Sequence, residues 1–546
     1  MEIAENIEQI TKDFVAVKSV NSTSGEKDAA DYLEGRLLQI PYFTDHADQV
    51  IRQPLAHDAL QRSNIFAYLH GLKSPSNKTI LWHGHMDTVG TEDYGRLEPY
   101  ATNCERLAKE LLKIELPANI YEEIRSGDWL VGRGACDMKS GVAVFIGLME
   151  YLSTRLDTFS GNILLSINPV EENQHTGIIE GIKILKQLQK EHNFDYLFAI
   201  NNDYICPLYE GDTNKYVYMG AVGKLLPCIY IKGCETHVGQ CFEGFDASVA
   251  AAQLVTQINY NTDFCDNYNG EYTLPPSVLK LKDLKNHYNV QTAQEAFVYF
   301  NYFVHAKPTT AILDKLKQKT KRAMQNTAAK IAAGSQAYAQ LSSQKDIPAM
   351  HIPQVLTFTE LLKKAEAKSN KQLSDAILAD AQKRNTQGED KREISLALVR
   401  QLVNLLDEHE PLAIIFFAAP YCPYNTLRQE LPTEKTLIDR ITKIVIEFGQ
   451  SHNENYQIKQ FFPSLSDGSY LKINDDDESL RCLQENMPAM SELYPLPLTS
   501  IKSLNIPALN FGCYGKDAHK WSERVYKPYS FSVLPELILK TIYEFL

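Results

Sequence analysis

The nine residues Thr-Ile-Leu-Trp-His-Gly-His-Met-Asp, at positions 79–87, decide the fold class of this chain. The first four form a short apolar run, which is typical of a strand buried on both faces. Polar side chains follow at once, with His83, His85 and Asp87 at the carboxyl end of the run. In open α/β sheets, ligands bind beyond the carboxyl ends of the strands. The stretch therefore predicts one strand of such a sheet with a functional site at its end.

The same pattern recurs elsewhere in the chain. Apolar runs at 163–167 and 196–200 lead into Glu171-Glu172-Asn173 and Asn201-Asn202-Asp203, and a run at 506–511 precedes His519. A helical pattern at 142–152 separates two of these runs. Strands that alternate with helices predict an α/β fold with a mostly parallel sheet sandwiched by helices. A glycine-rich loop at 132–141 adds Asp137, just before that helix.

The pattern of apolar runs and helical segments changes near residue 222. Apolar runs at 225–231, 277–284 and 296–304 and helical patterns at 247–258 and 310–333 indicate a separate α+β domain. An apolar run at 413–418 is expected to resume the first sheet. We therefore expect a discontinuous catalytic domain, residues 1–221 and 411–546, with an inserted α+β lid or dimerisation domain at 222–410. Its part from about 345 to 410 is expected to be a helical elaboration.

Composition excludes several classes of protein. The chain has 546 residues, enough for two or three domains, and a net charge of -13, which argues against a nucleic-acid partner. Its start lacks a signal-peptide pattern, and no apolar run is long enough to span a membrane. The ten cysteines contain no Cys-x-x-Cys pair, so we expect neither a thiolate zinc site nor a disulfide framework. A cytoplasmic protein with no membrane partner fits best.

Five candidate metal ligands stand out: His85, Asp137, Glu172, Asp203 and His519. Imidazole and carboxylate groups are the ligands that zinc accepts in catalytic sites. Each residue alone has a structural explanation, such as a polar strand end or an acidic helix start. Five such segments at strand ends favour a site for two divalent ions, zinc first, with cobalt or manganese as alternatives.

These segments, in this order, resemble the co-catalytic zinc exopeptidases and deacylases, which include aminoacylase, glutamate carboxypeptidase and succinyl-diaminopimelate desuccinylase. The match consists of Gly-His-x-Asp, Gly-x-Gly-x-x-Asp-x-Lys, a Glu-Glu pair, a later acidic residue and a late His. Asp-Tyr-Gly at 93–95 and Ser-Asp-Gly-Ser-Tyr at 466–470 look most like the arginine-utilisation, RocB-like branch.

The resemblance implies a role for each residue. His85 and Asp203 would hold one metal ion, Glu172 and His519 the other, and Asp137 would bridge them. Asp87 would hydrogen-bond the His85 ring as an outer partner. Glu171 would be the general base that takes a proton from metal-bound water. The implied activity is hydrolysis of an amide bond in a small peptide or N-acyl amino acid.

The segment Gly-Cys-Glu-Thr-His at 233–237 resembles the one whose histidine completes a partner subunit's active site in this family. His237 would then stabilise the oxyanion across a homodimer interface. A histidine packed beside a strand is the structural alternative.

A non-catalytic relative that binds metal as a scaffold or partner in amino-acid utilisation is the alternative function, but such proteins usually lose a ligand or the base.

Four further side chains need an interpretation. Ser469 occupies the slot where many relatives carry an Arg for the substrate carboxylate, and a hydroxyl cannot replace that guanidinium. Arg524 or a nearby lysine is a candidate to compensate. His83 is assigned to structure or substrate contact. Cys136 is rejected as a nucleophile because no orienting histidine is indicated near it.

Overall fold

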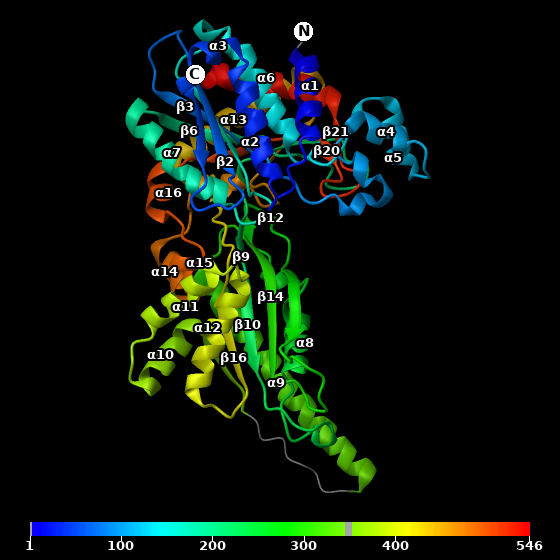
Figure 1. Cartoon of the computed structure of the whole chain (residues 1–546), viewed down its shortest axis with the longest axis vertical. Coiled ribbons are helices and arrows are strands. Elements are labelled where there is room, and N and C mark those ends of the chain that lie inside the picture. Colours follow the sequence, from blue (N-terminus) through cyan, green and yellow to red (C-terminus); the bar gives the residue numbers. More distant parts are fainter. Residues whose placement is uncertain (1–2, 344–351) are drawn as a thin grey trace. The chain divides into compact units, whose positions relative to one another are not determined.

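The computed structural model describes residues 3–343 and 352–546, coloured along the chain in Figure 1. They form two compact units. The first comprises Met1–Val222, Tyr424–Ile473 and Pro497–Leu546, and the second Gly223–Pro423 and Asn474–Leu496. The chain thus leaves the first unit twice and returns to it twice.

An eight-stranded sheet forms the centre of the first unit, in the order β1-β2-β5-β3-β6-β19-β7-β18. The strands are β1 (Val50–Pro54), β2 (Ser63–His70), β3 (Lys78–His85), β5 (Asn162–Asn168), β6 (Asp195–Asn201), β7 (Lys215–Tyr218), β18 (Tyr456–Lys459) and β19 (Ala508–Phe511). The central strands β5, β3, β6 and β19 run parallel, as do β7 and β18, whereas the β1–β2, β2–β5 and β19–β7 pairs are antiparallel. The expected mostly parallel sheet is confirmed.

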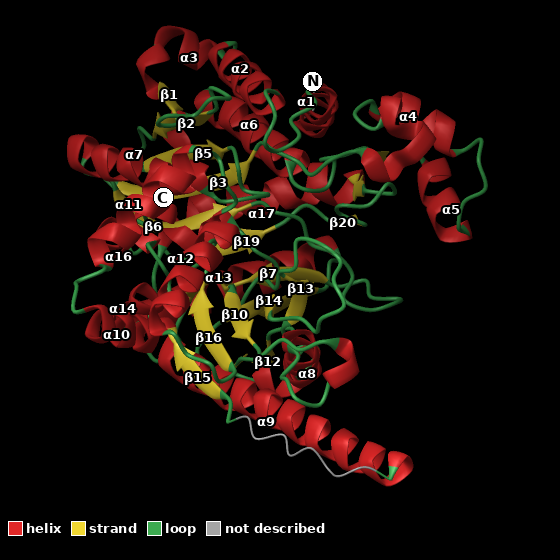
Figure 2. Cartoon of the chain, turned by 60° about the horizontal axis from the view of Figure 1, so that its bottom comes forward, coloured by secondary structure: helices red, strands yellow, loops and turns green. Residues whose placement is uncertain are grey.

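Helices cover this sheet because alternate strand residues are apolar on both faces. Ile65, Ala67 and Leu69 of β2 pack into one core, and Phe66 and Tyr68 point to the opposite face. The first core includes side chains from α1 (Ile3–Ala16), α2 (Gly25–Leu38), α6 (Lys139–Ser153), α13 (Pro432–His452) and α17 (Leu534–Phe545). α7 (Thr176–His192) contacts β2 and β5, and α16 (Leu498–Leu504) packs on α7. Figure 2 shows these helices around the strands.

A small three-stranded sheet, in the order β20-β21-β4, matters for the site. It joins β4 (Trp129–Val131) to β20 (Gly515–Lys516) and β21 (Arg524–Tyr526). The loop that follows β4 contains Asp137, and the loop between β20 and β21 contains His519. This sheet therefore brings together two loops that are almost 400 residues apart. Helices α4 (Cys104–Leu111) and α5 (Ala118–Ser126) pack against β4.

The second unit has its own sheet, in the order β13-β14-β10-β16-β15, with β9 paired to β14. The strands are β9 (Gly223–Leu225), β10 (Pro227–Lys232), β13 (Ser277–Asp283), β14 (Glu295–Val304), β15 (Gln354–Thr357) and β16 (Leu412–Phe417). The helices are α8 (Ala247–Ile258), α9 (Thr309–Ser342), α10 (Phe358–Ser369), α11 (Ser374–Thr386), α12 (Lys391–Leu406), α14 (Asp477–Asn486) and α15 (Met490–Leu493). α10, α11 and α12 share a core with β10 and β16, and 344–351 lie outside the described residues.

The expectation that 413–418 resumes the first sheet is wrong. β16 lies inside the second sheet, where it pairs antiparallel with β10 and parallel with β15. Its six residues are all buried, and a buried apolar run fits the centre of either sheet equally well. The observed second unit therefore continues to Pro423, beyond the expected boundary at 410, and also includes Asn474–Leu496. Within the described residues, no helix is both long and apolar enough to cross a membrane.

Candidate metal centre

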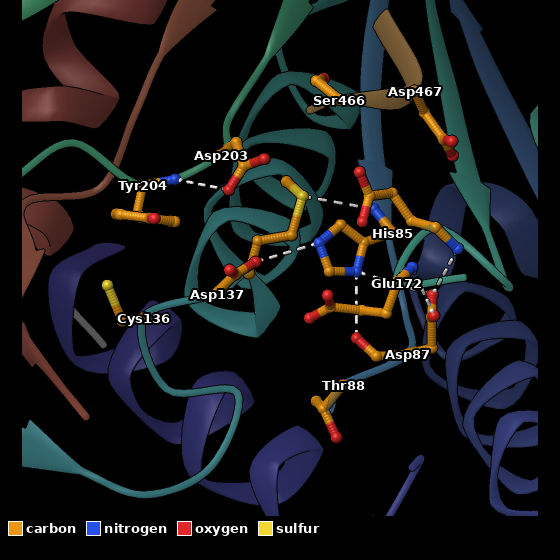
Figure 3. Close-up of polar contacts among 12 residues, drawn as sticks. His85, Asp87, Thr88, Cys136, Asp137, Glu172, Asp203, Tyr204, Ser466 and Asp467 are labelled. Carbon is orange, nitrogen blue, oxygen red and sulfur yellow. Dashed lines mark hydrogen bonds and ion pairs between the residues drawn. The ribbon is translucent and has the colours of Figure 1, made fainter. Parts of the chain in front are cut away.

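His85 is the last residue of β3, and its ring is buried at the carboxyl edge of the sheet. Its Nδ1 lies 3.0 Å from the backbone carbonyl oxygen of Asp87, and its Nε2 lies 3.1 Å from Oδ1 of Asp137. Figure 3 shows the ring between these two residues. A carbonyl oxygen only accepts hydrogen bonds, so Nδ1 carries a proton. In the neutral ring the lone pair is then on Nε2, the atom that faces Asp137, as a metal ligand requires.

Asp137 faces a histidine with each of its carboxylate oxygens. Oδ2 lies 3.1 Å from Nε2 of His519, while Oδ1 faces His85. Nε2 of His519 also lies 2.9 Å from Oε1 of Glu172. Two groups of ligand atoms, each with all members within 4.8 Å of one another, therefore share Asp137: His85, Asp137 and Asp203, and Asp137, Glu172 and His519. All five expected ligands are brought together, and the shared carboxylate has the geometry of a bridge.

The charges of this cluster also favour cations. Burial, and after it the charge of Asp137, raises the pKa of Asp203 to about 8. Burial lowers the pKa of His519, but hydrogen bonds to Asp137 and Glu172 outweigh it and raise that pKa to about 11. Three carboxylates crowded in a buried space are costly to ionise together unless positive charge balances them. Nitrogen and oxygen donors of this kind fit two divalent ions such as zinc.

The loop that carries Asp137 is held by buried charges. Glu523, fully buried, accepts hydrogen bonds from the backbone N–H groups of Cys136 (3.0 Å) and Asp137 (3.2 Å). Its other oxygen pairs with Arg133 at 2.7 Å, and Arg133 also pairs with Asp93 at 2.7 Å. Glu523 is four residues past His519, and no local motif singled it out. Its role depends on the pairing of β21 with β4.

Glu171 and Glu172 lie in a turn after β5, and two distant carboxylates hold its backbone. Asp87 accepts from the N–H of Glu171 at 3.1 Å and of Glu172 at 3.0 Å. Glu26, buried in α2, accepts from the N–H of Val170 at 3.0 Å. The resemblance predicts a hydrogen bond between the His85 ring and Asp87; the ring nitrogen Nδ1 makes it with the backbone carbonyl of Asp87, and the carboxylate lies 3.6 Å away. Its hydrogen bonds to this turn are an additional function that sequence reasoning missed.

The other expected site residues lie in the second unit or form hydrogen bonds and ion pairs with groups outside the cluster. His237 lies in the second unit, exposed, where its Nδ1 accepts a hydrogen bond from the N–H of Gly239 at 3.1 Å. Ser469 is fully buried and donates to the carbonyl of Val222 at 3.0 Å. Arg524 is buried and forms ion pairs with Glu123 and Asp517, so its guanidinium stabilises the loop that carries His519. Within the first unit, the described contacts of Ser469 and Arg524 do not include any of the five clustered side chains.

Two buried side chains near the cluster are uncharged. Burial lowers the pKa of His83 to about 4, so its ring is neutral at pH 7. Burial, followed by the charge of Glu523, holds the pKa of the Cys136 thiol well above its usual range. A protonated thiol is a poor nucleophile, which agrees with the rejection of Cys136.

The sequence is similar to one family of peptidases and to several known proteins. The model of the peptidase family M20/M25/M40 matches residues 81–473. Protein RocB of Bacillus subtilis (strain 168) is 36% identical over 541 residues, which are 99% of this chain and 95% of that protein. Succinyl-diaminopimelate desuccinylase of Cupriavidus pinatubonensis is 24% identical over 46% of this chain and 57% of its own length.

Among solved structures, aminopeptidase PepT from Bacillus cereus ATCC 10987 matches with a TM-score of 0.53 and 12% sequence identity. The match covers 99% of this chain and 98% of that one. At this identity the likeness concerns the fold alone, and it agrees with the mixed, mostly parallel sheet and the second sheet of the two units.

Proposed function

Because the chain belongs to the M20/M25/M40 peptidase family, we propose that it is a dinuclear metal-dependent hydrolase of amide bonds in small peptides or N-acyl amino acids. The observation that carries the proposal is the sharing of Asp137 between two ligand groups, with His85 on one oxygen and His519 on the other. His85 and Asp203 are assigned to one ion, Glu172 and His519 to the second, and Asp137 to both. Zinc is the first choice, with cobalt or manganese as alternatives.

Divalent ions held by these residues would supply Lewis acidity toward water and toward the amide carbonyl near neutral pH. Glu171 is assigned the proton transfers. It takes a proton from the attacking water and delivers it to the leaving nitrogen, which becomes an amine. Burial raises the pKa of Glu171 well above its ordinary value, which suits a group that must hold a proton between the two steps. Its anchored backbone places it next to the ligand Glu172.

Glu171 and Glu172 are neighbours with different assigned tasks, so their variants should fail differently. We expect Glu171→Gln to keep its metal content and fold while its turnover falls by roughly 10²–10⁴-fold, the usual contribution of a positioned base. Glu172→Gln should lose metal affinity because a charged ligand is removed. The measurements are elemental analysis and hydrolysis of a panel of dipeptides and acylated amino acids at equal added metal. Near-normal turnover of Glu171→Gln would exclude the mechanism, and absence of any turnover by the wild type would favour a metal-binding partner protein.

We also propose a cytoplasmic homodimer in which His237 completes the site of the partner subunit. Its Nδ1 accepts from a backbone N–H, so the neutral ring carries its proton on Nε2, an N–H that can bind an oxyanion. The structure records no disulfide among the described residues, which agrees with a reducing compartment. His237→Ala should lower kcat by roughly 10²–10³-fold with normal metal content. Light scattering is the second measurement, since a strict monomer with full activity contradicts this role.

The buried hydroxyl of Ser469 supports a substrate whose free carboxylate, if it has one, is not bound at this slot. Its hydrogen bond to Val222 makes it part of the fold. The substrate panel should therefore include amides and esters at that end. We expect them to be hydrolysed about as well as the free acids, because no guanidinium is placed there to discriminate.

A further inference from the structure

A second cluster of titratable side chains lies beside the metal centre: Glu171, His175 and Asp467. His175 and Asp467 are both almost fully buried, and neither is a ligand in the assignment above. His175 Nδ1 lies 2.8 Å from Oδ1 of Asp467 and 3.9 Å from Oε1 of Glu171. One ring nitrogen therefore lies between two carboxylates, one of which is the proposed base.

The ring of His175 is held in place from several directions. Its residue has φ of 56°, and its backbone N–H donates to the carbonyl of Val170 at 2.8 Å, which closes the turn around Glu171. The ring packs against Tyr470, with centroids 5.1 Å apart. Non-glycine residues with positive φ are uncommon and persist where the surrounding structure holds them. The backbone bond to Val170 and the packing on Tyr470 therefore orient the His175 ring toward Asp467.

Asp467 is itself anchored to the central sheet. It begins a short 3-10 helix, Asp467–Leu471, whose N-cap Ser466 accepts a hydrogen bond from the side chain of Asn201 at 2.9 Å. Asn201 is the last residue of β6, two positions before the candidate ligand Asp203. Asp467, which contacts His175, and the candidate ligand Asp203 are therefore both positioned by the carboxyl end of β6. Within the described residues, Oδ2 of Asp467 has no hydrogen-bond partner.

We propose that Asp467, acting through His175, is a positioning residue for the Glu171 carboxylate. The inference rests on the proposed function of Glu171. Asp87 and Glu26 contact only the backbone of the turn, whereas Nδ1 of His175 lies 3.9 Å from the Glu171 carboxylate, within ion-pair distance but beyond hydrogen-bond distance. The ring also separates two carboxylates that would otherwise repel each other across a buried space. The three side chains are spaced closely enough to hold an ion, and the 2.8 Å contact with His175 engages only Oδ1 of Asp467, so a bound ion is the alternative that the metal content of Asp467→Ala decides.

The test compares His175→Ala, Asp467→Ala and the double variant with His175→Asn. Misplacement of a reacting group by about 1 Å costs roughly 10²-fold in rate, so we expect kcat to fall by about that factor in both Ala variants. KM should change by less than about threefold, and two metal ions per chain should remain. The double variant should be no slower than the single ones, because the two residues act as one unit. Asn tolerates the positive φ and keeps an N–H near the place of Nδ1, so His175→Asn should recover most of the rate.

Asn193→Ala is the matched control, because Asn193 ends the same helix with φ of 54° and is exposed. It carries the same backbone strain without touching the site and should keep full kcat. A second measurement does not depend on activity: in a crystal structure of metal-free His175→Ala, the Glu171 carboxylate should leave its wild-type place. An unmoved Glu171, additive loss in the double variant, or loss of a third bound ion in Asp467→Ala would each overturn the proposal. Failure of the proposed function appears separately, as a wild type that hydrolyses nothing while Glu171 still moves.

Discussion

At the scale of single residues, the candidate site depends on carboxylates outside the proposed set of ligands. Asp87 and Glu523 each accept two backbone N–H groups from the loops that carry the ligands. A buried carboxylate can serve in this way because the N–H groups and a nearby cation compensate for its lost hydration. In Glu523 that cation is Arg133, at 2.7 Å. Such outer groups orient the ligands and commonly change metal affinity when they are removed.

We expect Glu523→Ala to weaken metal binding by roughly 10–100-fold, as loss of an outer partner does. It should also lower the free energy of unfolding by about 3–5 kcal/mol at most, since the buried Arg133 loses one of its two carboxylate partners and keeps Asp93. Metal titration and urea unfolding are the measurements. Glu544→Ala is the control, because Glu544 is exposed near the end of α17. Equal metal affinity in the two variants would show that Glu523 does not position Asp137.

At the scale of elements, the turns that join strands to helices determine where the candidate ligands lie. The loop between β4 and α6 passes close to its neighbours, and Gly134 has φ of 80° there. A Cβ on Gly134 would lie 2.8 Å from Cγ2 of Thr88, so a larger residue must push the loop away. Asp137 follows three residues later, and its place would change with the loop. The glycine is therefore required by backbone conformation and by space together.

Gly134→Ala tests this requirement, and Gly211→Ala is its matched control. Gly211 has φ of 83°, but a Cβ there would have no atom within 4 Å. Both variants carry the strain of a positive φ, about 1 kcal/mol, and only Gly134→Ala adds the clash. We expect it to be the less stable of the two by about 1–3 kcal/mol and to bind less metal. Equal urea midpoints would mean that the loop relaxes without cost.

At the scale of the whole molecule, folding and metal binding are coupled through protons. In the metal-free protein the pKa of Asp203 is raised from 3.8 to about 8, so the stability from its extra proton is present at low pH and lost as pH rises toward 8. The pKa of His519 is raised from 6.5 to about 11, so its contribution is also lost as pH rises, although its half-exposed ring is partly screened by solvent. A metal ion held by Asp203 or His519 would compete with these protons and would reduce this pH dependence.

The Tm of the chelator-treated protein should therefore fall between about pH 6 and about pH 8.5, whereas that of the zinc-loaded protein should change less. The difference between the two forms should be larger at the higher pH. Scanning calorimetry at both values measures it. Asp203→Asn removes one of the titrating groups, and its metal-free form should show a shallower fall. A metal-free Tm that rises across this interval would contradict the proposed proton linkage.

Local sequence pattern was sufficient to predict the fold class and the segments that form the candidate metal centre. Both depend on local pattern: an apolar run of strand length buries on both faces, and the polar residue that follows must lie at the sheet edge. His85 and Asp203 follow this rule directly at the ends of β3 and β6. Glu172 and His519 follow it through short loops.

Only the tertiary structure decided which distant residues support those segments. Glu523 and Arg133 are 390 positions apart, and His175 and Asp467 are 292 apart. No periodicity of the chain encodes such pairs, because they depend on the path that brings two strand ends together. The expected place of β16 in the first sheet was wrong for the same reason, since a buried apolar strand satisfies its side chains in either sheet and only hydrogen bonding to β10 selects one. The local sequence pattern thus predicts whether a side chain lies at a sheet edge or in the hydrophobic core. The topology of the chain determines which distant residue it contacts there.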